Sequence, residues 1–193
     1  AEAEGPTEET PRVVASICAN CHGFDGNGRG EGAFPRLAGL PSEYLSATLQ
    51  AYTNGERHSG IMEPLAARLE ESDIEEIASY YSGQPLARSG SPAAEEATVA
   101  RGRKIANEGL PKQNVGACIA CHPLDREVHN PNYPFLAGQP ADYLSLQIEL
   151  FKNRRRGGTE FSKLMHPISD GLEPRQKREV AAFYESAEKN ANR

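Results

Sequence analysis

The stretch Cys18-Ala19-Asn20-Cys21-His22 has the form C-x-x-C-H, and the same form returns at Cys118-Ile119-Ala120-Cys121-His122. The two copies use all four cysteines of the chain, so none remains for a disulfide. C-x-x-C-H is the pattern for covalent attachment of a c-type haem. On a helical turn, residues three and four apart share a face, so both thiols and the histidine would face one porphyrin. We predict covalent haem bonds at Cys18, Cys21, Cys118 and Cys121, and axial iron ligands at His22 and His122.

Two other uses of C-x-x-C fit this sequence less well. A thioredoxin-like redox pair needs a βαβ setting, which the sequence around neither motif predicts. A structural zinc site needs four nitrogen or sulfur ligands close together, whereas these pairs lie about a hundred residues apart. The repetition of the motif, with no spare cysteine, favours haem over both alternatives.

The composition suits short helices joined by punctuated loops. The 193 residues include 18 glycines and 14 prolines but no tryptophan, and the hydrophobic fraction is 38%. Two domains of about 90 residues with so little apolar surface would have thin cores, which two large flat porphyrins would complete. A stretch rich in Gly, Ser and Pro separates the halves. We predict domains at residues 1–85 and 97–193, joined by a linker at 86–96.

The charge is unevenly divided between these halves. Residues 1–90 carry 6 basic and 14 acidic side chains, a net of −8, whereas residues 91–193 carry 15 and 13, a net of +2. An acidic chain with one short basic run does not suit nucleic-acid binding. No segment approaches the roughly 20 apolar residues that span a bilayer, although peripheral membrane association stays open. Because the sequence opens without an initiator methionine and c-type haem is attached outside the bacterial cytoplasm, we expect a periplasmic protein.

An internal repeat follows the two motifs. The stretch from Phe34 to Ser46, FPRLAGLPSEYLS, matches the stretch from Tyr133 to Ser145, YPFLAGQPADYLS. Apolar and aromatic residues then recur at helical spacing in both copies. We predict two equivalent helices with buried faces formed by Tyr44, Leu45, Thr48, Leu49 and Tyr52, and by Tyr143, Leu144, Gln147, Ile148 and Phe151.

Each copy then reaches a polar loop that contains a methionine, in GIMEPL (60–65) and KLMHPI (163–168). Met62 and Met165 are the only methionines, and each lies about 40 residues after its motif and two before a proline. A lone methionine usually fills a core, but two at matching places favour the second axial ligand of each iron. His58, His166 and Lys163 stay open as replacements for these ligands, and His129 follows the second motif.

Further signals predict the remaining elements. Ser72 with Glu75 three residues later predicts a capping box that opens a helix through Tyr81, and Pro174 opens the last helix. Residues 93–108 form the first helix of the second half, which Gly109 ends. The glycine-rich residues 23–32 lack the G-K-[S/T] ending of a phosphate-binding loop, so we expect them to wrap the haem edge.

Taken together, the two motifs, the repeated Pro-x-Leu-Ala-Gly-x-Pro-x-x-Tyr-Leu stretch and the two methionines resemble the dihaem cytochrome c4 family over residues 10–187. The resemblance implies an all-α fold of two tandem class I cytochrome c domains, two haem c groups, and ligation by His22 with Met62 and by His122 with Met165. It also implies that the carbonyls of Pro35 and Pro134 accept hydrogen bonds from the axial histidines. The expected haem-pocket residues are Pro35, Leu37, Tyr44, Pro134, Leu136 and Tyr143. The chain departs from the pattern at Leu40, where the second copy has Gln139, and in its basic stretch 152–156.

Filled axial positions leave no open iron site for a substrate, so the sequence predicts an electron carrier and not an enzyme. Each haem would carry one electron between a respiratory or sulfur-oxidising donor and a terminal acceptor. The alternatives are a cytochrome subunit of a thiosulfate or sulfide dehydrogenase, and a dihaem enzyme with a labile ligand on the second haem. Residues 154–156, all arginine, are a candidate docking patch for a redox partner, either a dehydrogenase or a membrane oxidase complex. The acidic first half should leave the second haem with the higher potential.

Overall fold

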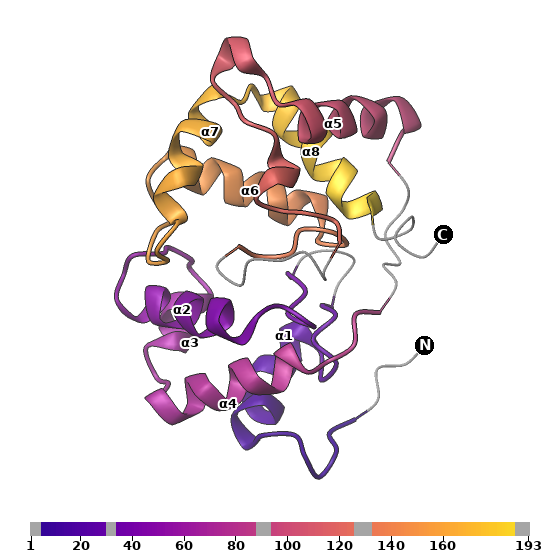
Figure 1. Cartoon of the computed structure of the whole chain (residues 1–193). Coiled ribbons are helices and arrows are strands. Elements are labelled where there is room, and N and C mark those ends of the chain that lie inside the picture. The colour runs from indigo at the N-terminus through magenta and orange to yellow at the C-terminus, as the bar shows by residue number, and fades with distance from the viewer. Residues whose placement is uncertain (1–4, 30–33, 88–93, 126–132, 188–193) are drawn as a thin grey trace.

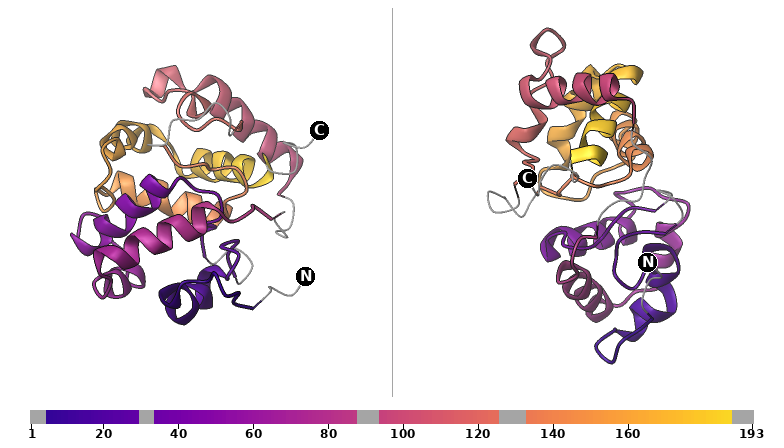
Figure 2. Two further views of the ribbon diagram at one scale, coloured as in Figure 1. Left: turned by 60° about the horizontal axis from the view of Figure 1, so that its bottom comes forward. Right: turned by 90° about the vertical axis from the view of Figure 1, so that its right-hand side faces the viewer.

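The computed structural model describes residues 5–29, 34–87, 94–125 and 133–187. Throughout these ranges every regular element is a helix, and the only strand-like pairings are two isolated bridges. The chain forms two lobes that lie against each other, the first from indigo to magenta and the second from rose to yellow (Figure 1). Two further directions of view show the same two-lobed arrangement (Figure 2). The predicted all-α fold is confirmed.

The first lobe is built from one irregular and four regular elements: a π-helical segment Val14–Cys18, α1 Ala19–His22, α2 Ser42–Thr53, α3 Met62–Ala66 and α4 Glu71–Ser82. Helix α2 packs against α4 and α3. As the apolar spacing predicts, α2 buries Tyr44, Leu45 and Leu49, which join Ile77 and Tyr81 of α4 in one core.

The second lobe contains α5 Glu96–Glu108, short 3₁₀ turns at Pro111–Gln113, Cys118–Ala120 and Ser162–Leu164, α6 Ala141–Lys152, α7 Met165–Gly171 and α8 Pro174–Ala187. Helix α8 packs against both α5 and α6. The predicted start at Pro174 and the end of α5 before Gly109 are confirmed. The core of the second lobe contains Ile105, Leu144, Val180 and Phe183. Each lobe therefore has its own core, and Phe135 of the second half packs into the core of the first.

Two local predictions were wrong. The capping box of α4 is formed by Glu70 and Asp73, and Ser72 lies inside the first turn, because the Asp73 carboxylate accepts the Glu70 N–H at 3.0 Å. Met62 and Met165 begin α3 and α7 and do not lie in loops. The proline two residues after each methionine is compatible with this, because a first helical turn needs no N–H donor there.

The second motif turns more tightly than the first. Residues 118–120 form a 3₁₀ turn that the Cys121 N–H closes by donating to the Cys118 carbonyl at 3.2 Å, and the His122 N–H donates to the same carbonyl at 2.8 Å. The first motif instead continues a helix that has already begun upstream. Both conformations are helical turns, so cysteine and histidine share a face in each copy.

Within the described ranges, none of the helices combines the length and the apolar character that crossing a bilayer requires. The linker prediction at 86–96 falls largely on residues 88–93, which lie outside the described residues, as does His129.

Candidate functional site

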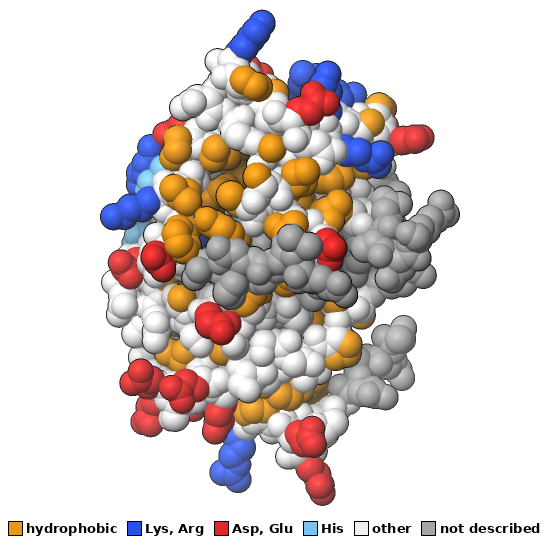
Figure 3. Space-filling model, viewed as in Figure 1, with side chains coloured by type: hydrophobic (Ala, Val, Ile, Leu, Met, Phe, Trp, Pro, Cys, Tyr) orange, Lys and Arg blue, Asp and Glu red, His pale blue; other side chains and the backbone are white. Residues whose placement is uncertain are grey.

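One cavity of about 1070 Å³ is lined by both lobes. All the predicted attachment and ligand residues line it: Cys18, Cys21, His22, Met62, Cys118, Cys121, His122 and Met165. So do the expected pocket residues Pro35, Leu37, Tyr44, Pro134, Leu136 and Tyr143. Apolar side chains gather on the second lobe just above the lobe boundary in Figure 3. The fold thus brings together two sets of residues that lie about a hundred positions apart in sequence.

The two histidines predicted as axial ligands are held in a defined tautomer. His22 Nδ1 lies 2.9 Å from the carbonyl oxygen of Pro35, and His122 Nδ1 lies 2.9 Å from that of Pro134. A carbonyl oxygen only accepts, so each Nδ1 carries a proton, and in the neutral ring Nε2 keeps its lone pair. Burial lowers the pKa of His22, which also favours the neutral ring. These are the hydrogen bonds that the resemblance implies, and they leave Nε2 of each ring available to bind a metal.

Cys18 and Cys118 have the character of protonated thiols. Burial raises the pKa of Cys18 to about 11 and that of Cys118 to about 11. A thioredoxin-like nucleophile would need a lowered thiol pKa instead. Within the described residues no three His, Cys, Asp or Glu side chains come together as a metal-binding group, so a zinc site lacks its donor set. The donors present fit haem c.

The alternative axial ligands are placed differently from the methionines. Neither Lys163 nor His166 is among the described residues that line the cavity. The ring of His166 faces the edge of Phe151, with 6.3 Å between centroids. His58 does line the cavity, but its Nδ1 lies 3.2 Å from a Glu63 carboxylate oxygen. The geometry therefore favours Met62 and Met165 over these three.

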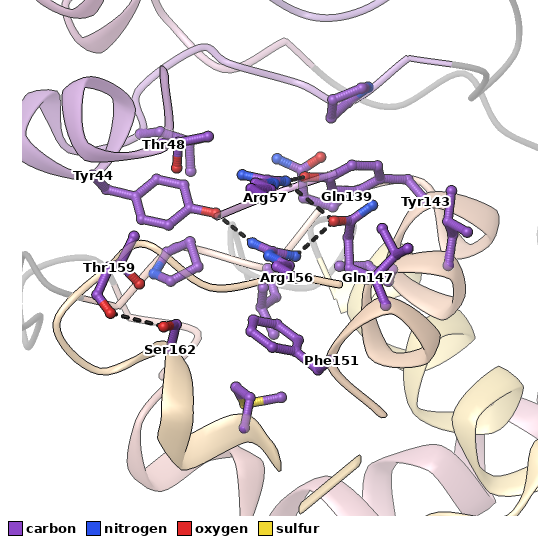
Figure 4. Close-up of a pocket in the computed structure, with 18 of the residues that line it drawn as sticks. Tyr44, Thr48, Arg57, Gln139, Tyr143, Gln147, Phe151, Arg156, Thr159 and Ser162 are labelled. Carbon is purple, nitrogen blue, oxygen red and sulfur yellow. Dashed lines mark hydrogen bonds between the residues drawn. The ribbon is translucent and has the colours of Figure 1, made fainter. Parts of the chain in front are cut away.

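Arg57 and Arg156 are site residues that the prediction missed. Their side chains are buried between the lobes beside Tyr44, Tyr143 and Gln147 (Figure 4). Burial alone would lower the pKa of Arg57, but the surrounding tyrosines, Tyr143 foremost, hold the pKa above its ordinary value. A signal for them exists in the sequence, because each arginine follows its repeat tyrosine by 13 residues.

The three consecutive arginines do not form one exposed docking patch, so that prediction was wrong. Arg156 is only 9% exposed, and its guanidinium donates to Gln147 and Tyr44. Arg154 pairs with the carboxylate of Asp170 at 2.6 Å. The φ angle of Arg154 is +58°, a turn that reverses successive side chains and sends its neighbours to different environments.

The chain resembles known proteins over most of its length. Residues 8–82 match the family model for cytochrome c. The thiosulfate dehydrogenase electron acceptor of Thiomonas intermedia is 33% identical over 169 residues, which cover 88% of this chain and 77% of that protein. Cytochrome c4 of Pseudomonas aeruginosa is 30% identical over 173 residues, which cover 89% and 83%.

Two solved structures have the same fold. Reduced recombinant cytochrome c4 from Pseudomonas stutzeri superposes with a TM-score of 0.80 at 28% identity, over 94% of this chain and 98% of that one. Thiosulfate dehydrogenase from Marichromatium purpuratum gives a TM-score of 0.78 at 32% identity over 88% of this chain, which spans only 36% of that longer chain. The chain therefore belongs to the dihaem cytochrome c4 family and is an electron-transfer protein with two haem c groups.

Proposed function

We propose that each lobe holds one haem c through its own motif and its own methionine. Thioether bonds form at Cys18 and Cys21 in the first lobe and at Cys118 and Cys121 in the second. The axial pairs are His22 with Met62 and His122 with Met165. The supporting observation is that all eight side chains line one cavity, and that the Nδ1 atoms of His22 and His122 are hydrogen-bonded to proline carbonyls. Residues 1–85 and 97–193 are the corresponding domains, with 86–96 as linker.

Bound haem c would supply a reversible one-electron couple. The chain's own residues position it and keep water away. The Pro35 and Pro134 carbonyls fix the imidazole planes and make both rings stronger donors. A thioether ligand and an apolar pocket lined by residues such as Leu49 and Leu144 favour the ferrous state. With both axial positions filled, the protein carries electrons and has no site at iron for a substrate.

The proposed partner is a sulfur-oxidising dehydrogenase in the periplasm. Two relatives, 33% and 30% identical to this chain, are named thiosulfate dehydrogenase electron acceptors. Their names support a thiosulfate-oxidising enzyme as donor. A membrane oxidase complex is the proposed terminal acceptor. A permanent cytochrome subunit is the second candidate, because this chain resembles one part of a longer thiosulfate dehydrogenase chain.

Optical spectroscopy of the purified holoprotein tests the ligation. We expect the far-red charge-transfer band of methionine-bound ferric haem, at an intensity that accounts for both haems. Met62→His and Met165→His should each remove half of it, and the exposed-face control Gln50→Leu on α2 should remove none. A high-spin haem, or ready binding of carbon monoxide at both ferrous centres, would contradict the proposal. Stopped-flow mixing with a reduced thiosulfate dehydrogenase then tests the partner.

A further inference from the structure

Two arginines at the interface each donate a hydrogen bond to a tyrosine of the opposite lobe. Arg57 of the first lobe donates through Nη2 to the Tyr143 hydroxyl of the second lobe at 3.0 Å. Arg156 of the second lobe donates through Nη2 to the Tyr44 hydroxyl of the first at 2.7 Å. Both also donate to the same Gln147 oxygen, at 3.1 and 2.9 Å (Figure 4). Each guanidinium is therefore placed by the opposite lobe.

Both guanidiniums are held rigidly. An antiparallel bridge joins the backbone of Arg57 to that of Arg156. The Arg57 guanidinium stacks on the Tyr52 ring at 4.8 Å and that of Arg156 on the Phe151 ring at 4.5 Å. Two positive charges are thus fixed side by side at the centre of the interface.

In the part of the chain that the structure describes, no carboxylate pairs with either of these charges. Arg57 is 4% exposed and Arg156 is 9% exposed. Among the described residues neither guanidinium forms an ion pair with a carboxylate; their partners are hydroxyls and an amide. The Arg57 Nε is buried and, within the same ranges, has no hydrogen-bond partner. A buried charge without a counter-charge is strongly unfavourable, so this arrangement calls for an anion in the adjoining space.

That space is the cavity that the two haem motifs line, and both arginines line it too. A porphyrin of the haem c type carries two carboxylate groups, and the planar fork of a guanidinium matches a carboxylate. We infer that Arg57 and Arg156 bind the carboxylates of both haems and thereby tune the two redox potentials jointly. This inference rests on the proposed function, because it assumes one haem in each lobe.

The consequence concerns the equilibrium between oxidised and reduced iron. Positive charge near haem favours the reduced state, and it also keeps a neighbouring carboxylate ionised. Since each arginine is anchored by the other lobe's tyrosine, the loss of either one should change both potentials and not only that of its own lobe. A purely structural arginine would not produce this pattern.

The test compares Arg57→Gln and Arg156→Gln with Arg154→Gln, an exposed arginine paired to Asp170 that does not line the cavity. In spectroelectrochemical titrations of the holoproteins, each buried variant should lower the ratio of reduced to oxidised iron about tenfold at both haems. That order is expected for one unit charge removed from a low-dielectric site, and tenfold corresponds to 59 mV for one electron. The control should leave both potentials within about twofold of the parent.

A second readout separates charge from packing. Without an arginine the carboxylates should take up protons in the neutral range, so the potentials of the glutamine variants should fall as pH rises. Tyr44→Phe and Tyr143→Phe remove hydrogen bonds but keep both charges, and their potentials should stay independent of pH. Changes of redox potential that are confined to one haem, or that are no larger than the change in Arg154→Gln, would overturn the inference. If the methionine band is intact in these variants, the proposed function still holds.

The parent protein supplies a test that needs no variant to fold. If the arginines hold the haem carboxylates ionised, both parent potentials stay constant across the neutral pH range. A parent whose potentials titrate there with carboxylate protonation, detected in infrared difference spectra, would overturn the inference. A colourless protein or a missing methionine band would instead refute the proposed function.

Discussion

Gln139 pairs with the backbone of Arg36 through both ends of its side-chain amide. The Oε1 atom accepts the Arg36 N–H at 3.0 Å, and Nε2 donates to the Arg36 carbonyl at 2.6 Å. The pair joins the two lobes and is buried. At the matching place the first copy of the repeat has Leu40, which is buried in the core of its own lobe. At this position the second copy therefore contacts the other lobe, whereas the first copy packs within its own.

Gln139→Leu should therefore weaken the protein even though it restores the residue of the other copy. The change removes both hydrogen bonds that the Gln139 side chain makes with the Arg36 backbone, which costs about 2 kcal/mol. Denaturant unfolding of the holoprotein measures this loss. Gln50→Leu, on the exposed side of α2, serves as the matched control and should change stability by less than about 0.5 kcal/mol. Equal stability of the two variants would contradict the assigned role of Gln139.

The elements that occur in both halves could be predicted from the sequence, whereas the contacts between the two halves could not. The motifs, α2 and α6 follow from spacing, because helical periodicity reports which face is buried. Periodicity does not report what covers that face, so the partners of Gln139, Arg57 and Arg156 could not be foreseen from it. The wrong prediction of the α4 capping box has a similar cause. The sequence offers two possible capping pairs, Glu70 with Asp73 and Ser72 with Glu75, and the second begins two residues after the first. Only packing decides between them.

Gly102 marks the crossing of α5 and α8, and we predict that it does not tolerate even a methyl group. By helix propensity alone, Gly102→Ala would stabilise an interior helical position by about 1 kcal/mol. An alanine Cβ would, however, overlap the carbonyl oxygen of Glu179 and come within 3.0 Å of the Phe183 Cβ. Separating these helices should cost about 3 kcal/mol, giving a clear net loss in thermal or denaturant unfolding.

Gly83→Ala supplies the matched control for that experiment. At Gly83 a Cβ would meet its nearest atoms at an ordinary 3.7 Å, so stability should be unchanged or slightly higher. A Gly102→Ala variant as stable as Gly83→Ala would show that α5 can shift on α8 without cost.

Two tyrosine hydroxyls donate hydrogen bonds to backbone carbonyls at the end of the two haem motifs. We predict that removal of either hydroxyl destabilises its lobe. The Tyr184 hydroxyl donates to the His122 carbonyl at 3.0 Å, and the Tyr81 hydroxyl donates to the Gly23 carbonyl at 3.0 Å. Tyr184→Phe and Tyr81→Phe each remove one hydrogen bond to a buried carbonyl, which costs about 1 kcal/mol. Thermal unfolding of the holoprotein measures the loss. Tyr52→Phe, which keeps the ring that packs on Arg57, is the control, and similar melting of all three variants would contradict the prediction.

The haem of the second lobe should have the higher redox potential, because the two lobes differ in charge. Acidic side chains such as Glu71, Glu75 and Glu76 are exposed on α4 of the first lobe, whereas α5 of the second exposes Arg101 and Lys104. Negative charge near haem favours the oxidised state and positive charge the reduced state. In spectroelectrochemical titrations, Met62→His should therefore lower the potential of the haem that has the lower potential in the parent protein. Met165→His should lower the potential of the other haem, which has the higher potential in the parent.

Ionic strength provides the control for this assignment. Exposed charges are screened beyond about 10 Å at 0.1 M salt, so added salt should narrow the separation between the two potentials. The separation would not narrow if buried charges set it, because salt screens buried charges much less than exposed ones. If Met165→His instead acted on the lower centre, surface charge would not determine the order, and the difference would have to come from contacts inside each pocket.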